Sequence, residues 1–405
     1  MIGRFLEIAL ERKGEPALAD DRQAWSFAEL SDRVRAYSEG LARSHKRPII
    51  YSALPGGPDQ VAVFLACLSV NAIHVPVPET IDPEQLRRCS SLLPPDAILF
   101  DEELDLEGLQ QRYAGALPQN CILLLAGMRA PTVLSGVRGH GRLCSLPESV
   151  RFANFDLRSA EKPRALLFAE ANFRADLEQS AAHFEAYAGQ RLFSVLGPSD
   201  PVSCSVVLGH LMQGSGLILS SCQSMGEQIE QIRRERPRGL LAPAQWLQRA
   251  LSLLDFGRDE LPSLKEIVLA AGPASFDLIT QLADAFSGLP IHIRYGIPES
   301  IGALLRYDYA DAADGFRPGY LGQALPGVEL EDLPLLGSGR ASELRLRAPS
   351  LAIAYTEEFG EWELLADENG WFGSGDVVQK DPRGGIFQNL WGRRPPPKPR
   401  HGVAG

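Results

Sequence analysis

The chain has 405 residues, of which 45% are hydrophobic and 22% charged, so it can bury a large core and is not expected to be disordered. A formal net charge of −11 at pH 7 excludes the clustered positive field that nucleic-acid binding requires. The six cysteines include no Cys-x-x-Cys pair, so neither a zinc site nor a disulfide framework is indicated. They are typical of buried thiols in a reducing compartment, and a cytoplasmic protein is expected.

The first 15 residues have the apolar spacing of an amphipathic helix. They carry charges throughout, unlike the apolar segment of a secretory signal. No apolar run in the sequence approaches the roughly 20 residues that a membrane-spanning helix needs. Neither a secretory signal nor a membrane span is therefore expected.

Helix and strand patterns alternate in the next part of the chain. Residues 26–41 begin with a capping Ser26, followed at the third position by Glu29, and then show helical periodicity. A strand over 48–54, a helix over 59–70 and a strand over 72–77 form a βαβ unit, which implies a parallel sheet covered by helices. The same patterns predict helices over 83–93, 174–186, 206–214, 227–236, 244–253 and 277–287, and strands over 97–100, 192–196, 216–220, 239–242, 264–271 and 290–294.

Two zones differ from this alternation. Residues 122–125 and the Gly/Ser-rich segment 135–145 form an irregular zone that the pattern does not assign. From about residue 315, short strands punctuated by glycine and proline replace the long helices, for example over 342–346 and 362–365. This change predicts a β-rich unit at the end of the sequence.

A series of short motifs runs along the chain. The motifs are WSFAEL at 25–30, VAVFLACLSVNAIHVPVPET at 61–80, PEQL at 83–86, LPSLKEIVLAAGPAS at 261–275, YGIPES at 295–300, GYLGQALPGVEL at 319–330, SELRLRAPSLAIAY at 342–355 and NGWFGSGD at 369–376. Any one of these motifs alone would be weak, but together and in this order they resemble the large N-terminal domain of the adenylate-forming superfamily, which includes acyl-CoA synthetases, nonribosomal peptide adenylation domains and luciferases.

The resemblance implies an α/β fold with two stacked αβ subdomains of mostly parallel sheets and a C-terminal β-rich subdomain that forms a distorted barrel. The subdomain limits are expected at 1–172, 173–313 and 314–391. A basic, proline-rich tail over 392–405 stands where the family has its hinge and its small C-terminal domain. That small domain, with its catalytic lysine, is expected to be absent, so no catalytic residue is assigned.

In this family a carboxylate attacks the α-phosphate of ATP, and a thiol then takes the acyl group from the adenylate. The resemblance places Gly272, Tyr295 and Gly296 near the adenine. It implies that Asp376 binds the ribose hydroxyls and that Arg393 contacts the ribose or the phosphate. It also makes Glu299 the magnesium ligand. ATP or AMP with magnesium is thus the implied cofactor set, and no metal cluster, flavin or NAD is expected.

The phosphate loop departs strongly from the family pattern. Residues 156–165 read DLRSAEKPRA, in which Ser159 and Pro163 are retained and Arg164 replaces the family lysine. All the glycines of the pattern are replaced, so a backbone that requires positive φ would be strained by roughly 1–2 kcal/mol at each such position. The alternative is that this segment is simply a solvated surface connection.

Other positions of the family pattern are also altered. Pro298 replaces a phosphate-contacting threonine and has neither a hydroxyl nor an N–H group to donate. Prolines at 395 and 399 replace an aspartate and a lysine of the hinge, and a run of prolines favours a stiff extended segment. Alternatives remain for two retained carboxylates. Glu299 could cap a helix after Pro298, and Asp376 could stabilise a turn.

Signals for the substrate are weak. Asp200 falls close to the carboxylate that amino-acid-activating members use for the substrate amine, but it could equally cap a helix. Trp246 corresponds to a helix near the acid pocket and could equally belong to the core. Glu170 stands where acyl and aryl activators often have histidine. No particular acid follows from these residues.

Two functions stay open. The first is a pseudoenzyme that binds an acyl or aminoacyl ligand, AMP, or a partner such as an acyl-carrier protein or a companion ligase. The second is a divergent ligase or acyltransferase that transfers a small carboxylic acid to a thiol, with its lid supplied by another chain. The abrupt basic tail could also reflect a truncated or frame-shifted product.

Overall fold

The structure is a computed structural model of the chain. It contains two compact units. Unit 1 comprises Met1–Leu241, Pro298–Gly302 and Ser350–Leu365, and unit 2 comprises Ala242–Ile297, Ala303–Pro349 and Ala366–Gly405. The described residues are 1–393 except 43–46, 102–103, 105, 114, 119–120, 127–131, 136–145, 157–163, 186–188, 200, 221, 223, 254–255, 271–273, 310–318, 335–340, 359–360 and 381–385.

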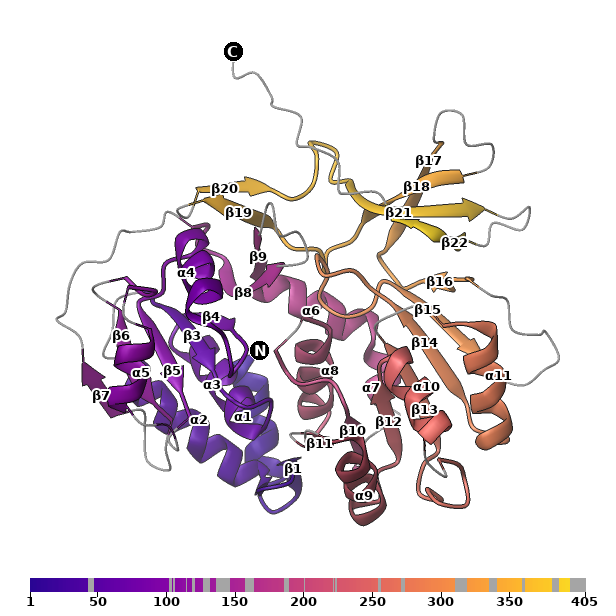
Figure 1. Cartoon of the computed structure of the whole chain (residues 1–405), viewed down its shortest axis with the longest axis horizontal. Coiled ribbons are helices and arrows are strands. Elements are labelled where there is room, and N and C mark those ends of the chain that lie inside the picture. Colours follow the sequence, from indigo (N-terminus) through magenta and orange to yellow (C-terminus); the bar gives the residue numbers. More distant parts are fainter. Residues whose placement is uncertain are drawn as a thin grey trace. The chain divides into compact units, whose positions relative to one another are not determined.

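A nine-stranded sheet of order β20-β19-β9-β8-β4-β3-β5-β6-β7 forms one part of unit 1 (Figure 1). Its central strands β8, β4, β3, β5 and β6 run parallel, whereas β9 is antiparallel to both β8 and β19. The bounds are β3 Ile49–Ala53, β4 Ile73–Pro76, β5 Ala97–Phe100, β6 Ile122–Leu125, β7 Thr132–Ser135, β8 Val150–Asp156, β9 Arg164–Ala169, β19 Ala354–Glu358 and β20 Glu361–Leu364.

Helices pack against this sheet because their apolar faces must be buried. Helix α2 begins as predicted: the Ser26 hydroxyl accepts from the Glu29 N–H at 3.3 Å, and the Glu29 carboxylate accepts from the Ser26 N–H at 2.8 Å. Helix α3 packs against α2, β3 and β4, and Val61 to Leu68 are all buried. The helices are α1 Ile2–Glu11, α2 Phe27–Leu41, α3 Pro58–Ser69, α4 Pro83–Leu92 and α5 Leu106–Arg112.

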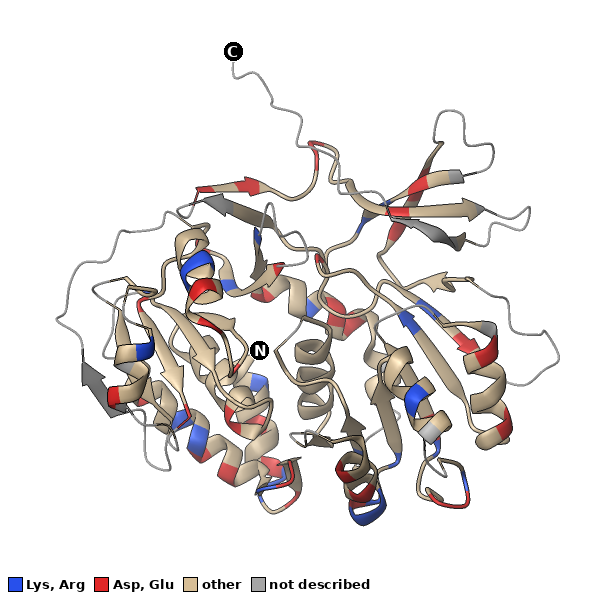
Figure 2. Cartoon of the chain, viewed as in Figure 1, with Lys and Arg blue, Asp and Glu red and all other residues tan. Residues whose placement is uncertain are grey.

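A second run of strands in unit 1 has the order β12-β10-β11-β1-β2. Strands β12, β10, β11 and β1 are parallel, and β2 returns antiparallel to β1. Its elements are β1 Pro16–Ala19, β2 Ala24–Ser26, α6 Glu170–Gln179, α7 Ala181–Glu185, β10 Arg191–Ser194, α8 Pro201–Met212, β11 Gly216–Leu219, α9 Met225–Glu235 and β12 Gly239–Ala242. Acidic and basic residues are interspersed along α2 and α9, as Figure 2 shows.

Unit 2 contains a strand run of order β16-β15-β14-β13 and a separate antiparallel sheet of order β17-β18-β21-β22. Strands β13 and β14 are parallel, and β15 is antiparallel to β14 with Asp308 opposite His292. The elements are α10 Ala244–Leu253, β13 Glu266–Ala270, α11 Phe276–Ala285, β14 Ile291–Tyr295, β15 Leu305–Tyr309, β16 Gln323–Ala324, β17 Glu329–Pro334, β18 Ala341–Arg347, β21 Phe372–Lys380 and β22 Ile386–Arg393.

The predicted fold class is confirmed: mostly parallel sheets with helices are followed by an antiparallel β-rich part. Two helices begin earlier than predicted: α6 begins at Glu170 instead of residue 174, and α8 begins at Pro201 instead of residue 206. The side chain of Asn172 accepts from the Ala169 N–H at 2.7 Å and so fixes the earlier start of α6, while proline is well suited to the first position of α8. Within the described ranges, no helix is both long and apolar enough to cross a bilayer. The predicted subdomain limits stay a prediction.

Candidate active site

The expected phosphate loop lies between two paired strands of unit 1. Strand β8 ends at Asp156 and β9 begins at Arg164, and these two residues are opposite one another in the register. Ser159 and Pro163 fall within 157–163 and lie outside the described residues. Since β8 is parallel to β4, and β4 to β3, β8 ends at the edge where the carboxyl ends of these strands meet. Ligands of open α/β sheets bind beside this edge.

Arg164 stands at the family lysine position, and its guanidinium group contacts an aromatic ring. The guanidinium carbon lies 4.5 Å from the centroid of the Tyr355 ring on β19, a cation–π contact. The hydroxyl of Tyr355 in turn donates to Glu363 Oε2 at 2.9 Å on β20. Strand β19 therefore holds the charge of Arg164 against an aromatic face at the start of β9.

Glu170 stands where related enzymes often carry histidine, and here it forms ion pairs within the chain. Its Oε1 atom lies 2.6 Å from the N-terminal amine of Met1 and 3.3 Å from Arg174 Nη2. Burial raises the pKa of Glu170, but the hydrogen bonds from the N-terminal amine and Arg174 outweigh this effect and hold the pKa below its ordinary value. The carboxylate thus anchors the N-terminus at the first turn of α6.

The YGIPES motif continues into unit 1 at Pro298. No helix follows Pro298; the backbone makes a turn, and Ser300 forms an isolated bridge with Leu351. The alternative that Glu299 caps a helix here is therefore wrong, because this segment is paired with the stretch before β19. The Glu299 carbonyl accepts from the Ala352 N–H at 2.8 Å, and its half-buried side chain remains the candidate magnesium ligand.

The adenine and ribose motifs of unit 2 lie on neighbouring elements. The Tyr295 hydroxyl, at the end of β14, donates to Asp376 Oδ2 at 2.5 Å. Asp376 lies within β21 and is only 3% exposed, and in the backbone register it is opposite Arg393 on β22. Gly296 is exposed next to Tyr295, whereas Gly272 lies outside the described residues. The structure thus brings together the tyrosine and the aspartate of two motifs that are distant in sequence.

The two predicted substrate residues give little further information. Asp200 lies outside the described residues, directly before the start of α8 at Pro201. Trp246 is half-buried on α10, and its ring packs edge-to-face against Phe256 with centroids 5.6 Å apart. This contact is typical of a core residue and does not by itself indicate a ligand.

The carboxylates fit a magnesium–nucleotide complex only in part. The described residues contain no group of three metal-ligating side chains. Magnesium bound with a nucleotide commonly takes one or two protein carboxylates and completes its shell with phosphate and water oxygens. Glu299 could supply such a contact, and Asp376 could accept from ribose hydroxyls in competition with its bond from Tyr295.

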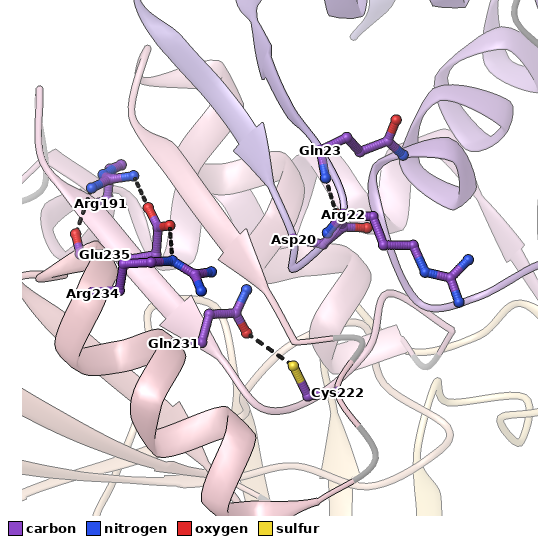
Figure 3. A network of polar contacts seen from close by, with 8 residues as sticks. All are labelled: Asp20, Arg22, Gln23, Arg191, Cys222, Gln231, Arg234 and Glu235. Atoms are coloured by element: carbon purple, nitrogen blue, oxygen red, sulfur yellow. Dashed lines mark hydrogen bonds and ion pairs between the residues drawn. The ribbon is translucent and has the colours of Figure 1, made fainter.

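The sequence did not predict a polar pocket in unit 1 that is lined by Cys222 and Gln231. Figure 3 shows these two side chains. Its residues come from loops after four strands and from α9. Of its lining residues, only Glu79 belongs to a motif on which the resemblance depends. Only the spatial arrangement brings them together, because Asp21 and Arg234 lie 213 positions apart in the sequence.

Comparisons with known proteins show which family and fold the chain resembles. The family described as AMP-binding enzyme matches residues 5–133. The chain is 22% identical over 414 residues to the salicylyl-CoA synthase / salicylate adenylyltransferase of Streptomyces sp, an alignment that covers 95% of this chain and 74% of that protein.

Two solved structures have the same fold. The amide bond synthetase McbA from Marinactinospora thermotolerans aligns with a TM-score of 0.76 at 19% identity, covering 96% of this chain and 78% of that one. The N-terminal domain of FACL13 from Mycobacterium tuberculosis aligns with a TM-score of 0.79 at 15% identity, covering 96% and 98%. The match over residues 5–133 assigns that part of the chain to the AMP-binding enzyme family, and the solved structures show that the chain has the fold of adenylate-forming enzymes.

Proposed function

We propose that this chain is a ligand-binding member of the adenylate-forming superfamily in which ATP-dependent activation of acids is impaired. It would bind AMP or an acyl or aminoacyl ligand and act as a pseudoenzyme or as the partner subunit of an active ligase. The hydrogen bond between Tyr295 and Asp376 carries the proposal. A second candidate is a divergent ligase or acyltransferase.

The bond from Tyr295 occupies the acceptor that the family uses for ribose. Asp376 Oδ2 already receives a phenolic O–H at 2.5 Å, and the carboxylate is 97% removed from solvent. Ribose hydroxyls would compete with this donor for the carboxylate, and a displaced phenol would need another partner because an unpaired buried polar group is destabilising. Weakened nucleotide binding follows from this exchange.

Changes at the phosphate-contacting positions point in the same direction. Pro298 supplies no hydroxyl and no N–H group to an α-phosphate. Arg164 contacts Tyr355, and aiming its charge at a phosphate would forfeit that contact. Adenylation needs developing phosphate charge to be neutralised by fixed donors, so loss of these donors slows the step more than it weakens ground-state binding.

A bound nucleotide would bring its triphosphate and a magnesium ion, for which Glu299 is the candidate ligand. This chain's own residues would hold the ribose at Asp376 and the adenine beside Tyr295 and Gly296. The small carboxylic acid, or its adenylate or thioester, is the expected second ligand. An acyl-carrier protein or a companion ligase is the expected protein partner. Reduced cysteines in the described part of the chain accord with a cytoplasmic location.

Calorimetric titration with AMP and with ATP–magnesium tests the proposal. We expect AMP to bind more tightly than ATP–magnesium, and pyrophosphate exchange to stay at background over a panel of acids. Asp376→Asn should weaken AMP binding by about tenfold, since a hydrogen bond to a charged group contributes roughly 1.5–3 kcal/mol. Glu343→Gln on the adjacent strand β18 removes the same charge in the same sheet and should leave AMP binding unchanged.

The second candidate has its own support, since Tyr295, Gly296, Glu299 and Asp376 are all retained at family spacing. Acid-dependent pyrophosphate exchange by the chain alone would establish this candidate and refute impairment. Unchanged AMP binding in Asp376→Asn, or tighter binding of ATP–magnesium than of AMP, would show that the bond from Tyr295 does not govern nucleotide binding.

A further inference from the structure

The polar pocket of unit 1 lies where the carboxyl ends of strands from both of its sheets meet. Asp21 follows β1, Cys222 follows β11, Pro55 follows β3 and Glu79 follows β4, and α9 closes the remaining side. The pocket holds about 670 Å³, within the range of small-molecule sites. Crevices at this edge of a parallel sheet are the usual ligand sites of α/β folds.

The pocket has an acidic lining. Asp21, Glu79, Glu227 and Glu230 contribute four carboxylates, against two guanidinium groups from Arg22 and Arg234. Both arginines also interact with carboxylates outside the lining: Arg234 Nε lies 3.2 Å from Glu235 Oε1, and Arg22 Nη1 lies 3.9 Å from Asp101 Oδ2. Figure 3 shows Arg234 turned toward Glu235.

The four carboxylates differ in the hydrogen bonds and ion pairs that they already form within the chain. Glu227 accepts from the Ser224 hydroxyl at 2.8 Å in a capping box, and Glu230 pairs with Arg233 at 2.5 Å. Asp21 and Glu79 are exposed and form no ion pair within the described part of the chain. These two carboxylates are therefore available to a ligand.

A buried amide lies deeper in the pocket. Gln231 is 1% exposed, and its Oε1 atom lies 3.8 Å from the thiol of Cys222, which points toward it (Figure 3). The Nε2 atom of the same amide has no hydrogen-bond acceptor among the described residues. A buried donor of this kind calls for an acceptor, and no side chain of the described lining supplies one.

The carboxylates of the lining also act on the thiol of Cys222. Partial burial raises the pKa of the Cys222 thiol, and the carboxylates of Asp21 and Glu227 raise it further, although Arg234 opposes them. The thiol therefore sits in a negative potential, which favours a cation and disfavours an anion.

We propose that this pocket binds a small organic cation, a primary amine that also carries an oxygen acceptor. The ammonium group would lie between Asp21 and Glu79, and the oxygen would accept from Gln231 Nε2. The pocket is separate from the residues assigned to the nucleotide. The proposal therefore does not depend on whether adenylation is impaired.

Ligand-observed NMR titration of the full chain tests the proposal with three probes. Ethanolamine carries both features, n-propylamine lacks the oxygen, and glycolate carries an anion in place of the amine. We expect ethanolamine to bind in the millimolar range that so few atoms allow, n-propylamine to bind more weakly, and glycolate not to bind. Added salt should weaken the binding of both amines.

Variants locate the site. Asp21→Asn combined with Glu79→Gln should weaken ethanolamine about fivefold to tenfold, because each exposed pair contributes modestly. Glu11→Gln combined with Glu39→Gln makes the same charge change on exposed positions of α1 and its neighbour α2, and should have no effect. Gln231→Met should abolish the preference for ethanolamine over n-propylamine.

Chemical modification of the wild-type chain tests the site without requiring that the variants fold. Alkylation of Cys222, verified by mass spectrometry of its peptide, should block ethanolamine binding in the wild-type chain. The proposal is overturned if glycolate binds as well as ethanolamine, if the two double variants bind ethanolamine equally, or if alkylation of Cys222 leaves binding intact.

Discussion

Replacing Asp176 with asparagine should stabilise the protein at pH 8 and do so much less at pH 5. Asp176 lies on α6 in unit 1 and is fully buried. Its Oδ2 atom accepts from the Ser205 hydroxyl, whereas Oδ1 has no hydrogen-bond partner among the described residues. Burial raises the pKa of this carboxyl from its ordinary 3.8 to about 7, although the bond from Ser205 acts in the opposite direction.

The direction of this pH dependence follows from the different pKa values of Asp176 in the unfolded and folded states. The unfolded chain ionises above pH 3.8, while the folded protein keeps its proton until about pH 7. Stability is therefore unaffected by this group below pH 3.8, falls as the pH rises toward 7, and is constant above that value. At ~1.36 kcal/mol per pKa unit, the full loss is about 4 kcal/mol, of which roughly 1.6 kcal/mol is already present at pH 5.

Urea unfolding of wild type and Asp176→Asn at the two pH values measures this loss. The asparagine variant keeps the shape and an acceptor for Ser205 but has no proton to lose. The difference in free energy of unfolding between variant and wild type should grow by about 3 kcal/mol from pH 5 to pH 8. Asp32→Asn, at an exposed position, should show no such growth. An equal difference at both pH values for Asp176→Asn would refute the argument from burial.

Three further changes test neighbouring parts of the argument. Gly302→Ala should lower the free energy of unfolding by at least ~1–2 kcal/mol in urea titration, because φ is +66° and the new Cβ would stand 1.9 Å from Asp176 Oδ1. Tyr295→Phe should cost about 1–3 kcal/mol by leaving Asp376 without its phenolic donor, and AMP should raise the Tm of this variant more than that of wild type. Burial lowers the pKa of His292, but hydrogen bonds with its two flanking carboxylates outweigh burial and raise the pKa above its ordinary value. The replacement His292→Gln should therefore destabilise the protein more at pH 6, below the ordinary pKa of 6.5, than at pH 9.

The sequence predicts elements well where local pattern and packing agree. The strand 97–100 and the helix 244–253 have the predicted bounds, and Ser26 with Glu29 forms the expected capping box. These features depend on residues a few positions apart, so they are visible in the sequence. The order of the motifs indicated the overall fold, because the family resemblance implies which strands are neighbours in the sheets.

Long-range partners could not be predicted in the same way. Strand β1 was missed because it has only four residues and is stabilised by pairing with β11, where Leu18 is opposite Leu217. The ion pair of Glu170 with the N-terminus joins residues 169 positions apart. Short strands and single ion pairs carry little local signal, and the sheet register decides them.

The candidate site shows why retained motif residues do not fix their chemistry. Asp376 and Tyr295 both stand at family positions, and the sequence assigns each of them to the nucleotide. In the structure they are bonded to one another, so the same two residues stabilise unit 2 in the absence of a nucleotide. In the proposed binding of AMP the ribose would compete with that bond, whereas adenylation additionally needs donors that Pro298 does not supply. Selection for stability alone can therefore preserve Tyr295 and Asp376 at the family positions. Comparing the AMP affinity of Tyr295→Phe with that of wild type separates this stabilising role from a role in nucleotide binding.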